Sequence, residues 1–135
     1  MTTPPSAEEL ATEMSEEAVR FIEFAHTQGV DLHFDVVSMS HAQALAQDMR
    51  AVLADREKRL RLAQWLGAYL GEVIRQAVPN SAWVWSPVFD TPAVQAARGA
   101  VHPMAQAVRF VIDEADEGLE IYVATALATL GGRSA

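Results

Sequence analysis

The chain contains no cysteine. Without thiols it cannot form a disulfide, offers no thiolate nucleophile and cannot build a zinc site from cysteine ligands. Several enzyme classes are thereby excluded. No other catalytic signature takes their place, because the sequence has no Walker phosphate loop, no G-x-G-x-x-G and no G-x-S-x-G pattern. We therefore expect no cofactor, and the sequence favours a protein without catalytic activity.

Long hydrophobic runs are also absent. The first ten residues, MTTPPSAEEL, have neither a basic segment nor an apolar core of the kind found in signal peptides. No later run reaches the roughly 20 apolar residues that a membrane-spanning helix needs. We therefore expect a cytoplasmic protein with no membrane association.

Basic residues are scarce, with ten Lys and Arg against 18 Asp and Glu, giving a formal net charge of −8. This balance argues against nucleic acid as a partner, since phosphate contacts need clustered basic side chains. One cluster exists at residues 55–61, DREKRLR, which holds four of the ten basic residues. Asp55 and Glu57 are interleaved there at spacings that suit helical ion pairs, so we interpret it as a solvated helix start, with a phosphate site as the alternative.

What the chain does contain is enough apolar surface for a core. Half of its 135 residues are hydrophobic, which predicts one globular domain over residues 1–135 with a loose tail at 1–5. The most apolar helix-length run is residues 62–75. Ala63, Gly67 and Gly71 lie at i, i+4 and i+8 in this run and form a strip of small residues. Because interior glycines cost a helix about 1 kcal/mol each, we expect another element to approach that strip closely.

Four further helices are predicted around this central one. Ser6 with Glu9, and Ser40 with Gln43, have the spacing of capping boxes and predict two helix starts. A bend at residues 54–57 should separate the second helix from the central one. Pro103 fits the first position of a fourth helix, and a fifth should cover residues 117–130 before Gly131.

Extended structure is predicted in two regions. Residues 30–37 alternate apolar and polar side chains, as in a short edge strand, or form a loop that inserts Leu32 and Phe34 into the core. Residues 82–85, 93–97 and 100–102 are typical of strands, the last two forming a hairpin that turns at Gly99. The fold class is therefore α+β, with about five helices and a central buried helix on a small antiparallel sheet of about three strands.

Two groups of side chains are candidates for chemistry. His33 and Asp35 would share one face of a strand with His41 nearby, which is a weak candidate metal site against polar residues at a strand edge. Glu72 is a weak catalytic candidate, a carboxylate at the boundary of a buried helix. Its alternative is a structural carboxylate satisfied by Arg75, Gln76 or a backbone N–H.

Candidate binding residues come from aromatic and acidic side chains. Trp83 and Trp85 would lie on one side of a strand, either in the core or as an aromatic hot spot for a partner. The outer face of the first helix is acidic, either as a solvated face or as a partner surface. The acidic residues expected to bind are Glu13, Glu17, Asp113 and Asp116.

The order of these motifs resembles a group of small bacterial domains of unknown function. The similarity rests on Y-L-G-E at residues 69–72 of a helix, Trp83 in a strand, and His102 with Pro103 at a helix start, and covers about residues 30 to 130. It implies a bacterial cytosolic domain, and because some members are encoded near toxins or secretion systems, it also implies immunity-like binding. The group has no established catalytic residues to carry over. Prolines at 87 and 92 interrupt the sheet more than its pattern expects, which leaves the strand count open.

The sequence thus favours a non-enzymatic protein-interaction domain, immunity-like or adaptor-like, whose acidic surface binds a basic protein partner. A homodimer remains open. The alternative is a small enzyme or ligand-binding domain with a pocket around Glu72 and Trp83.

Overall fold

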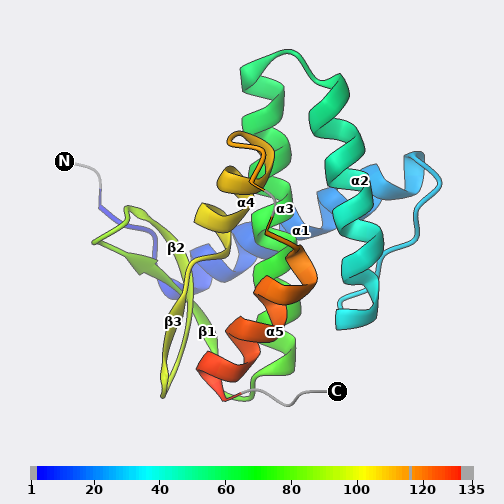
Figure 1. Cartoon of the computed structure of the whole chain (residues 1–135). Helices are drawn as coiled ribbons and strands as arrows, with labels where there is room; N and C mark the ends of the chain where they lie inside the picture. Colours follow the sequence, from blue (N-terminus) through cyan, green and yellow to red (C-terminus); the bar gives the residue numbers. More distant parts are fainter. Residues whose placement is uncertain (1–2, 116, 132–135) are drawn as a thin grey trace.

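A single helix, α3 (Arg56–Ala77), runs through the middle of the molecule and contacts most of the other elements (Figure 1). The computed structural model describes residues 3–115 and 117–131 of the chain. Within them, helices α1 (Ala7–Thr27), α2 (Met39–Val52), α4 (Pro103–Val111) and α5 (Leu119–Leu130) surround α3. Strands β1 (Ala82–Ser86), β2 (Thr91–Ala96) and β3 (Gly99–Val101) form one antiparallel sheet in the order β1-β2-β3. The predicted α+β class, with five helices and three strands, is confirmed.

The small-residue strip of α3 is a place of close approach, as predicted. Eleven of the helix's residues are buried, among them Gly67 and Gly71. Trp83 of β1 lies directly over Gly71, and Pro103 and Met104 of α4 lie over Gly67. Both glycines therefore let other elements contact the helix backbone, which offsets the conformational cost of glycine in a helix.

Several predicted helix ends are confirmed. The Ser6 hydroxyl oxygen accepts a hydrogen bond from the Glu9 amide at 3.2 Å and caps α1. Residues 53–55 are a short non-helical connection between α2 and α3, which overlaps the predicted bend. The Asp55 carboxylate caps α3 by accepting from the Glu57 amide at 2.8 Å. Gly131 ends α5 in a left-handed conformation, with φ of 79°. Each of these helix ends is set by residues close to it in the sequence, which is why the sequence alone predicts it.

The prediction of a second capping box, formed by Ser40 and Gln43, is wrong. Helix α2 begins at Met39, and its N-cap residue Ser38 makes no capping hydrogen bond with its side chain. Gln43 instead reaches across to α5, where its side-chain oxygen accepts from the Leu119 amide at 2.8 Å. The side chain thus caps a helix 76 residues further along the chain.

Residues 30–35 form a loop, not an edge strand, and lead into the short 3₁₀ helix η1 (Val36–Ser38). Leu32 is buried, and the ring of Phe34 packs on Tyr69 with 5.8 Å between centroids. The alternative of an inserting loop is therefore the correct one. Its side chains meet the core without any strand partner in the described part of the chain.

The hairpin of β1 and β2 turns through residues 87–90, so Thr91 and Pro92 belong to the second strand. Trp83 pairs with Val94, and Trp85 pairs with Pro92. In Figure 1 the sheet lies beside the first turns of α1, while α5 packs along β3. None of the helices in residues 3–115 and 117–131 has the length and hydrophobicity to cross a bilayer.

The burial of both tyrosines, Tyr69 and Tyr122, predicts that the protein loses stability in alkaline solution. Burial raises the pKa of Tyr69 and of Tyr122 well above 10, and nearby carboxylates add to it, Asp35 for Tyr69 and Glu117 for Tyr122. The unfolded chain releases both phenolic protons near pH 10, whereas the folded chain keeps them. The free energy of unfolding should therefore fall as pH rises above about 10, by at most about 1.4 kcal/mol per pH unit for each phenol.

Urea titrations from pH 9 to about pH 11 measure this slope, and absorbance of tyrosinate should appear only on unfolding. The Tyr122→Phe variant, which removes a hydroxyl that has no hydrogen-bond partner in the described structure, should halve the slope. Normal titration of both phenols near pH 10 in the native protein would contradict the prediction.

Candidate functional site

The carboxylate of Glu72 is held in place by two neighbours, Arg75 and Trp83. Glu72 is only 4% exposed. One oxygen accepts from Arg75 Nε and from the indole N–H of Trp83, the latter at 3.0 Å, and the other oxygen accepts from the Arg75 guanidinium at 3.2 Å. Hydrogen bonding to this carboxylate raises the pKa of the Arg75 guanidinium, which therefore keeps its charge. Both oxygens are therefore hydrogen-bonded within the protein, as expected for the alternative in which Arg75 satisfies the carboxylate.

A shallow hollow of about 330 Å³ lies beside this pair, where the first turns of α1 face the end of α3 and the start of β1. Its lining includes Glu72, Arg75 and Trp83. The hollow matches the place of the alternative enzyme or ligand-binding site. Glu72 already accepts hydrogen bonds from both Arg75 and Trp83, so these three side chains have little hydrogen-bonding capacity left for a ligand.

The two tryptophans of β1 have different environments. Trp83 is buried over Gly71, so it belongs to the core and is not exposed for a partner. Trp85 is two residues nearer the hairpin turn and remains partly exposed. The Trp85 side chain lines a groove together with Glu13 and Met14 of α1.

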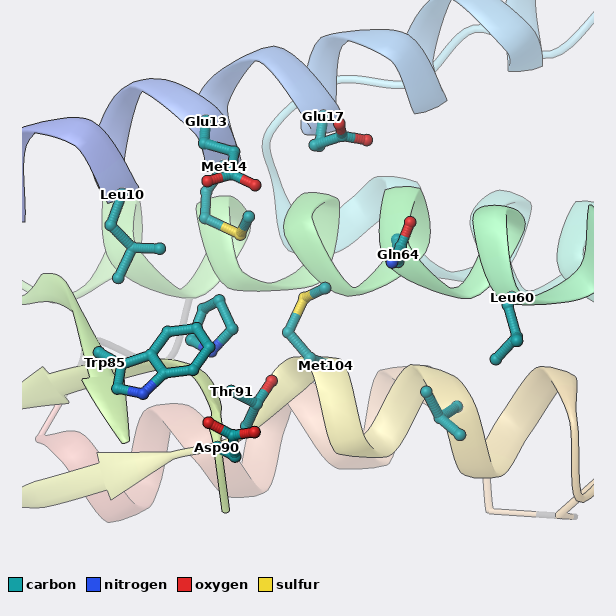
Figure 2. Close-up of a pocket in the computed structure, with 12 residues that line it drawn as sticks. Leu10, Glu13, Met14, Glu17, Leu60, Gln64, Trp85, Asp90, Thr91 and Met104 are labelled. Atoms are coloured by element: carbon teal, nitrogen blue, oxygen red, sulfur yellow. The ribbon is translucent and has the colours of Figure 1, made fainter. Parts of the chain in front are cut away.

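This groove brings three carboxylates and an indole together. It has a volume of about 350 Å³ and runs between α1 on one side and α4 with the hairpin on the other, with α3 beneath (Figure 2). We call it the acidic groove and define it by six of its lining residues, which are Glu13, Met14, Glu17, Trp85, Asp90 and Met104. The two methionines and the indole ring supply an apolar floor, and the acidic side chains surround it.

The charge of the acidic groove is of one sign. Its lining contains three carboxylates and no Lys, Arg or His. Glu17 forms an ion pair with Arg20 at 2.6 Å, one turn further along α1. Glu13 and Asp90 are exposed, and within the described residues neither has an ion pair. The groove therefore presents uncompensated negative charge from two different elements.

An apolar hairpin tip lies beside the groove. Val88 and Phe89, directly before Asp90, are 83% and 61% exposed. The rings of Phe89 and His102 pack in a T-shaped arrangement, with 4.5 Å between centroids. Val88 and Phe89 therefore present apolar surface to solvent beside the groove.

The remaining candidates do not converge on this site. Asp113 lies exposed in the connection between α4 and α5 and does not line the groove. Asp116 lies outside the described residues. The Asp35 carboxylate caps η1 by accepting from the Ser38 amide at 2.9 Å, and the described residues His33, Asp35 and His41 do not form a group that could hold a metal ion. In the parts of the chain that the structure describes, no three His, Asp or Glu side chains are grouped to hold a metal ion.

The sequence identified Glu13, Glu17 and Trp85 but not Asp90 or the two methionines of the groove. Asp90 lies in the turn of the hairpin with a φ of 53°, a left-handed conformation in which Asp is more common than most residues. Asp90 comes two residues before Pro92, the strand partner of Trp85, so the register of the hairpin is the signal that could have included it.

Comparisons with known proteins gave no match to a family model, a curated protein or a solved structure. The resemblance to small bacterial domains therefore stays a prediction, and we infer the function from the site itself.

Proposed function

We propose that the chain is a non-enzymatic interaction domain that binds a basic segment of a protein partner in the acidic groove. The observation that carries this proposal is that Glu13 and Glu17 of α1 and Asp90 of the hairpin line the same groove as the partly exposed Trp85. Such binding would suit an immunity-like or adaptor role toward a basic protein.

The chemistry of the groove fits an arginine or lysine side chain in two ways. An indole attracts a cation over its face, and carboxylates form charge-assisted hydrogen bonds with a guanidinium. The apolar floor made by Met14 and Met104 can contact the aliphatic stem of the same side chain. Methionine also adapts its shape to different partners.

The exposed hairpin tip extends the interface beyond the basic residue. Val88 and Phe89 offer an apolar contact beside the groove, so the preferred segment combines a basic residue with an apolar neighbour. Aromatic side chains commonly supply much of the affinity in such interfaces, while surrounding charges set the rate of association and the choice of partner.

Charge reversal in the groove tests the proposal. A peptide of alternating arginine and leucine should bind the wild-type chain and shift the indole N–H resonance of Trp85 in two-dimensional NMR spectra. Glu13→Lys and Asp90→Lys should each weaken binding about ten-fold, because each replaces an attraction with a repulsion. Added salt should weaken the wild-type interaction, since the charges are exposed.

The matched control is Glu16→Lys, which makes the same charge change at an exposed position of α1 outside the groove lining. It should alter affinity by less than about two-fold. A second control peptide carries glutamate in place of arginine and should not bind. Equal losses for Glu16→Lys and Glu13→Lys would overturn the proposal, because they would show attraction to net charge alone.

A further inference from the structure

A second pocket lies on another part of the molecule, where α1, α2 and α3 meet. It has a volume of about 240 Å³, and its apolar lining consists of Phe24, Met49, Leu53, Leu62 and Trp65. We call it the apolar pocket. Phe24 and Trp65 form one wall, with tilted rings whose centroids are 6.0 Å apart.

The pocket follows from the way α2 and α3 are joined. The two helices run side by side in Figure 1 and are connected by residues 53–55, yet α3 packs mainly on α1 and α4 and only lightly on α2. Met49 and Leu53 near the end of α2 are consequently only partly buried. Apolar side chains thus line a hollow that neighbouring helices leave unfilled.

Two basic side chains lie at this hollow in an otherwise acidic chain. Lys58 and Arg61 line the apolar pocket, and no acidic residue does. They lie at i and i+3 on α3, with Trp65 four residues after Arg61, so all three share one face of the helix. The charged lining of the apolar pocket is therefore opposite in sign to that of the acidic groove.

Two nearby arginines, Arg50 and Arg59, donate hydrogen bonds to backbone carbonyls, whereas within the described residues the side chains of Lys58 and Arg61 make no such bond. Arg59 donates to the Arg50 carbonyl at 2.6 Å and to the Leu53 carbonyl, and so caps the C-terminal end of α2. Arg50 donates to the Phe110 carbonyl at 2.8 Å. The ion pairs expected with Asp55 and Glu57 are not formed in the described structure, where neither Lys58 nor Arg61 has an ion pair.

We propose that the apolar pocket binds a small amphipathic carboxylate, with its apolar chain against the wall formed by Phe24 and Trp65 and its carboxylate at Lys58 and Arg61. A guanidinium and an ammonium next to an apolar hollow complement a ligand that has one anionic end and one apolar end. The volume of about 240 Å³ equals that of about eight water molecules in the liquid, which suits a ligand of about eight to ten non-hydrogen atoms. The site is separate from the acidic groove, so neither proposal depends on the other.

Octanoate is a suitable probe, because it has ten non-hydrogen atoms and one charge. Titration into the full chain should shift the indole N–H resonance of Trp65 and leave that of Trp85 in place. Octylamine, which also has eight carbons but the opposite charge, should bind at least ten-fold more weakly. The double variant Lys58→Gln and Arg61→Gln should weaken octanoate binding about ten-fold and leave octylamine unaffected or slightly strengthened.

The matched control is Arg56→Gln, which removes one positive charge from the same helix at an exposed position outside the pocket. It should change octanoate affinity by less than about two-fold. Equal binding of octanoate and octylamine, or unchanged octanoate binding in the double variant, would overturn the proposal. So would a dimer in sedimentation experiments that dissociates in the double variant, because a second copy of the chain would then be the occupant of the pocket.

Discussion

Replacing Gly71 with alanine is expected to lower the free energy of unfolding by about 3 kcal/mol. The added Cβ atom would overlap the six-membered part of the Trp83 indole and would lie 3.1 Å from Pro103 Cγ. Trp83 is fully buried and its indole is hydrogen-bonded to Glu72, so the ring cannot move aside without disturbing that contact. The gain of about 1 kcal/mol in helix propensity offsets only part of the loss.

Urea unfolding followed by circular dichroism measures the effect. Gly118→Ala is the control, since Gly118 has a φ of −69° and the nearest atom to its added Cβ would be the Gln43 side-chain oxygen, at 3.3 Å. It should change stability by less than about 1 kcal/mol.

A double variant separates steric overlap from other causes. Trp83→Leu removes the part of the indole that the new Cβ would meet, so Gly71→Ala should cost much less in that background. The same loss in both backgrounds would show that Gly71 is required for a reason other than the approach of Trp83.

The central helix illustrates how far the sequence could lead. Ala63, Gly67 and Gly71 revealed a close approach on one side of the helix, because glycines inside a helix are unfavourable unless another element packs against the backbone there. The sequence could not predict that Trp83 packs over Gly71 and Met104 over Gly67. That assignment depends on where β1 and α4 dock, which is decided by packing between residues far apart in the chain.

The error at Ser40 and Gln43 has the same origin. Their spacing fits a capping box, but the Gln43 side chain accepts from the Leu119 amide at the start of α5. Helix α5 has Gly118 as its N-cap residue and no capping side chain of its own. A local motif therefore fails when a distant backbone group that lacks a local partner binds the same side chain.

The candidate site was predictable in parts and not as a whole. Glu13 and Glu17 follow from the acidic face of α1, and the side shared by Trp83 and Trp85 follows from strand alternation. Alternation alone cannot show that the core ends between the two tryptophans. Only the placement of the hairpin against α1 exposes Trp85 and brings Asp90 opposite Glu13 in the acidic groove (Figure 2).

Replacing Glu72 with alanine is expected to lower the free energy of unfolding by about 3 kcal/mol. The change would leave the buried indole N–H of Trp83 without its acceptor and the partly buried Arg75 guanidinium without its counter-ion. Removing one member of a buried pair costs more than the pair contributes, because the remaining group stays desolvated. Glu72→Gln keeps an oxygen for the indole and should lose only about half as much.

Glu17→Ala is the matched control, because Glu17 and Arg20 form an ion pair at the same i, i+3 spacing in the same order. The side chains of Glu17 and Arg20 are 22% and 53% exposed, against 5% and 35% for Glu72 and Arg75, so solvent screens the α1 pair more strongly. Glu17→Ala should therefore cost less than about 0.5 kcal/mol in the same unfolding experiment. Equal losses at the two positions would contradict the role of burial, and a Glu72→Ala variant of wild-type stability would reopen Glu72 as a group free for chemistry.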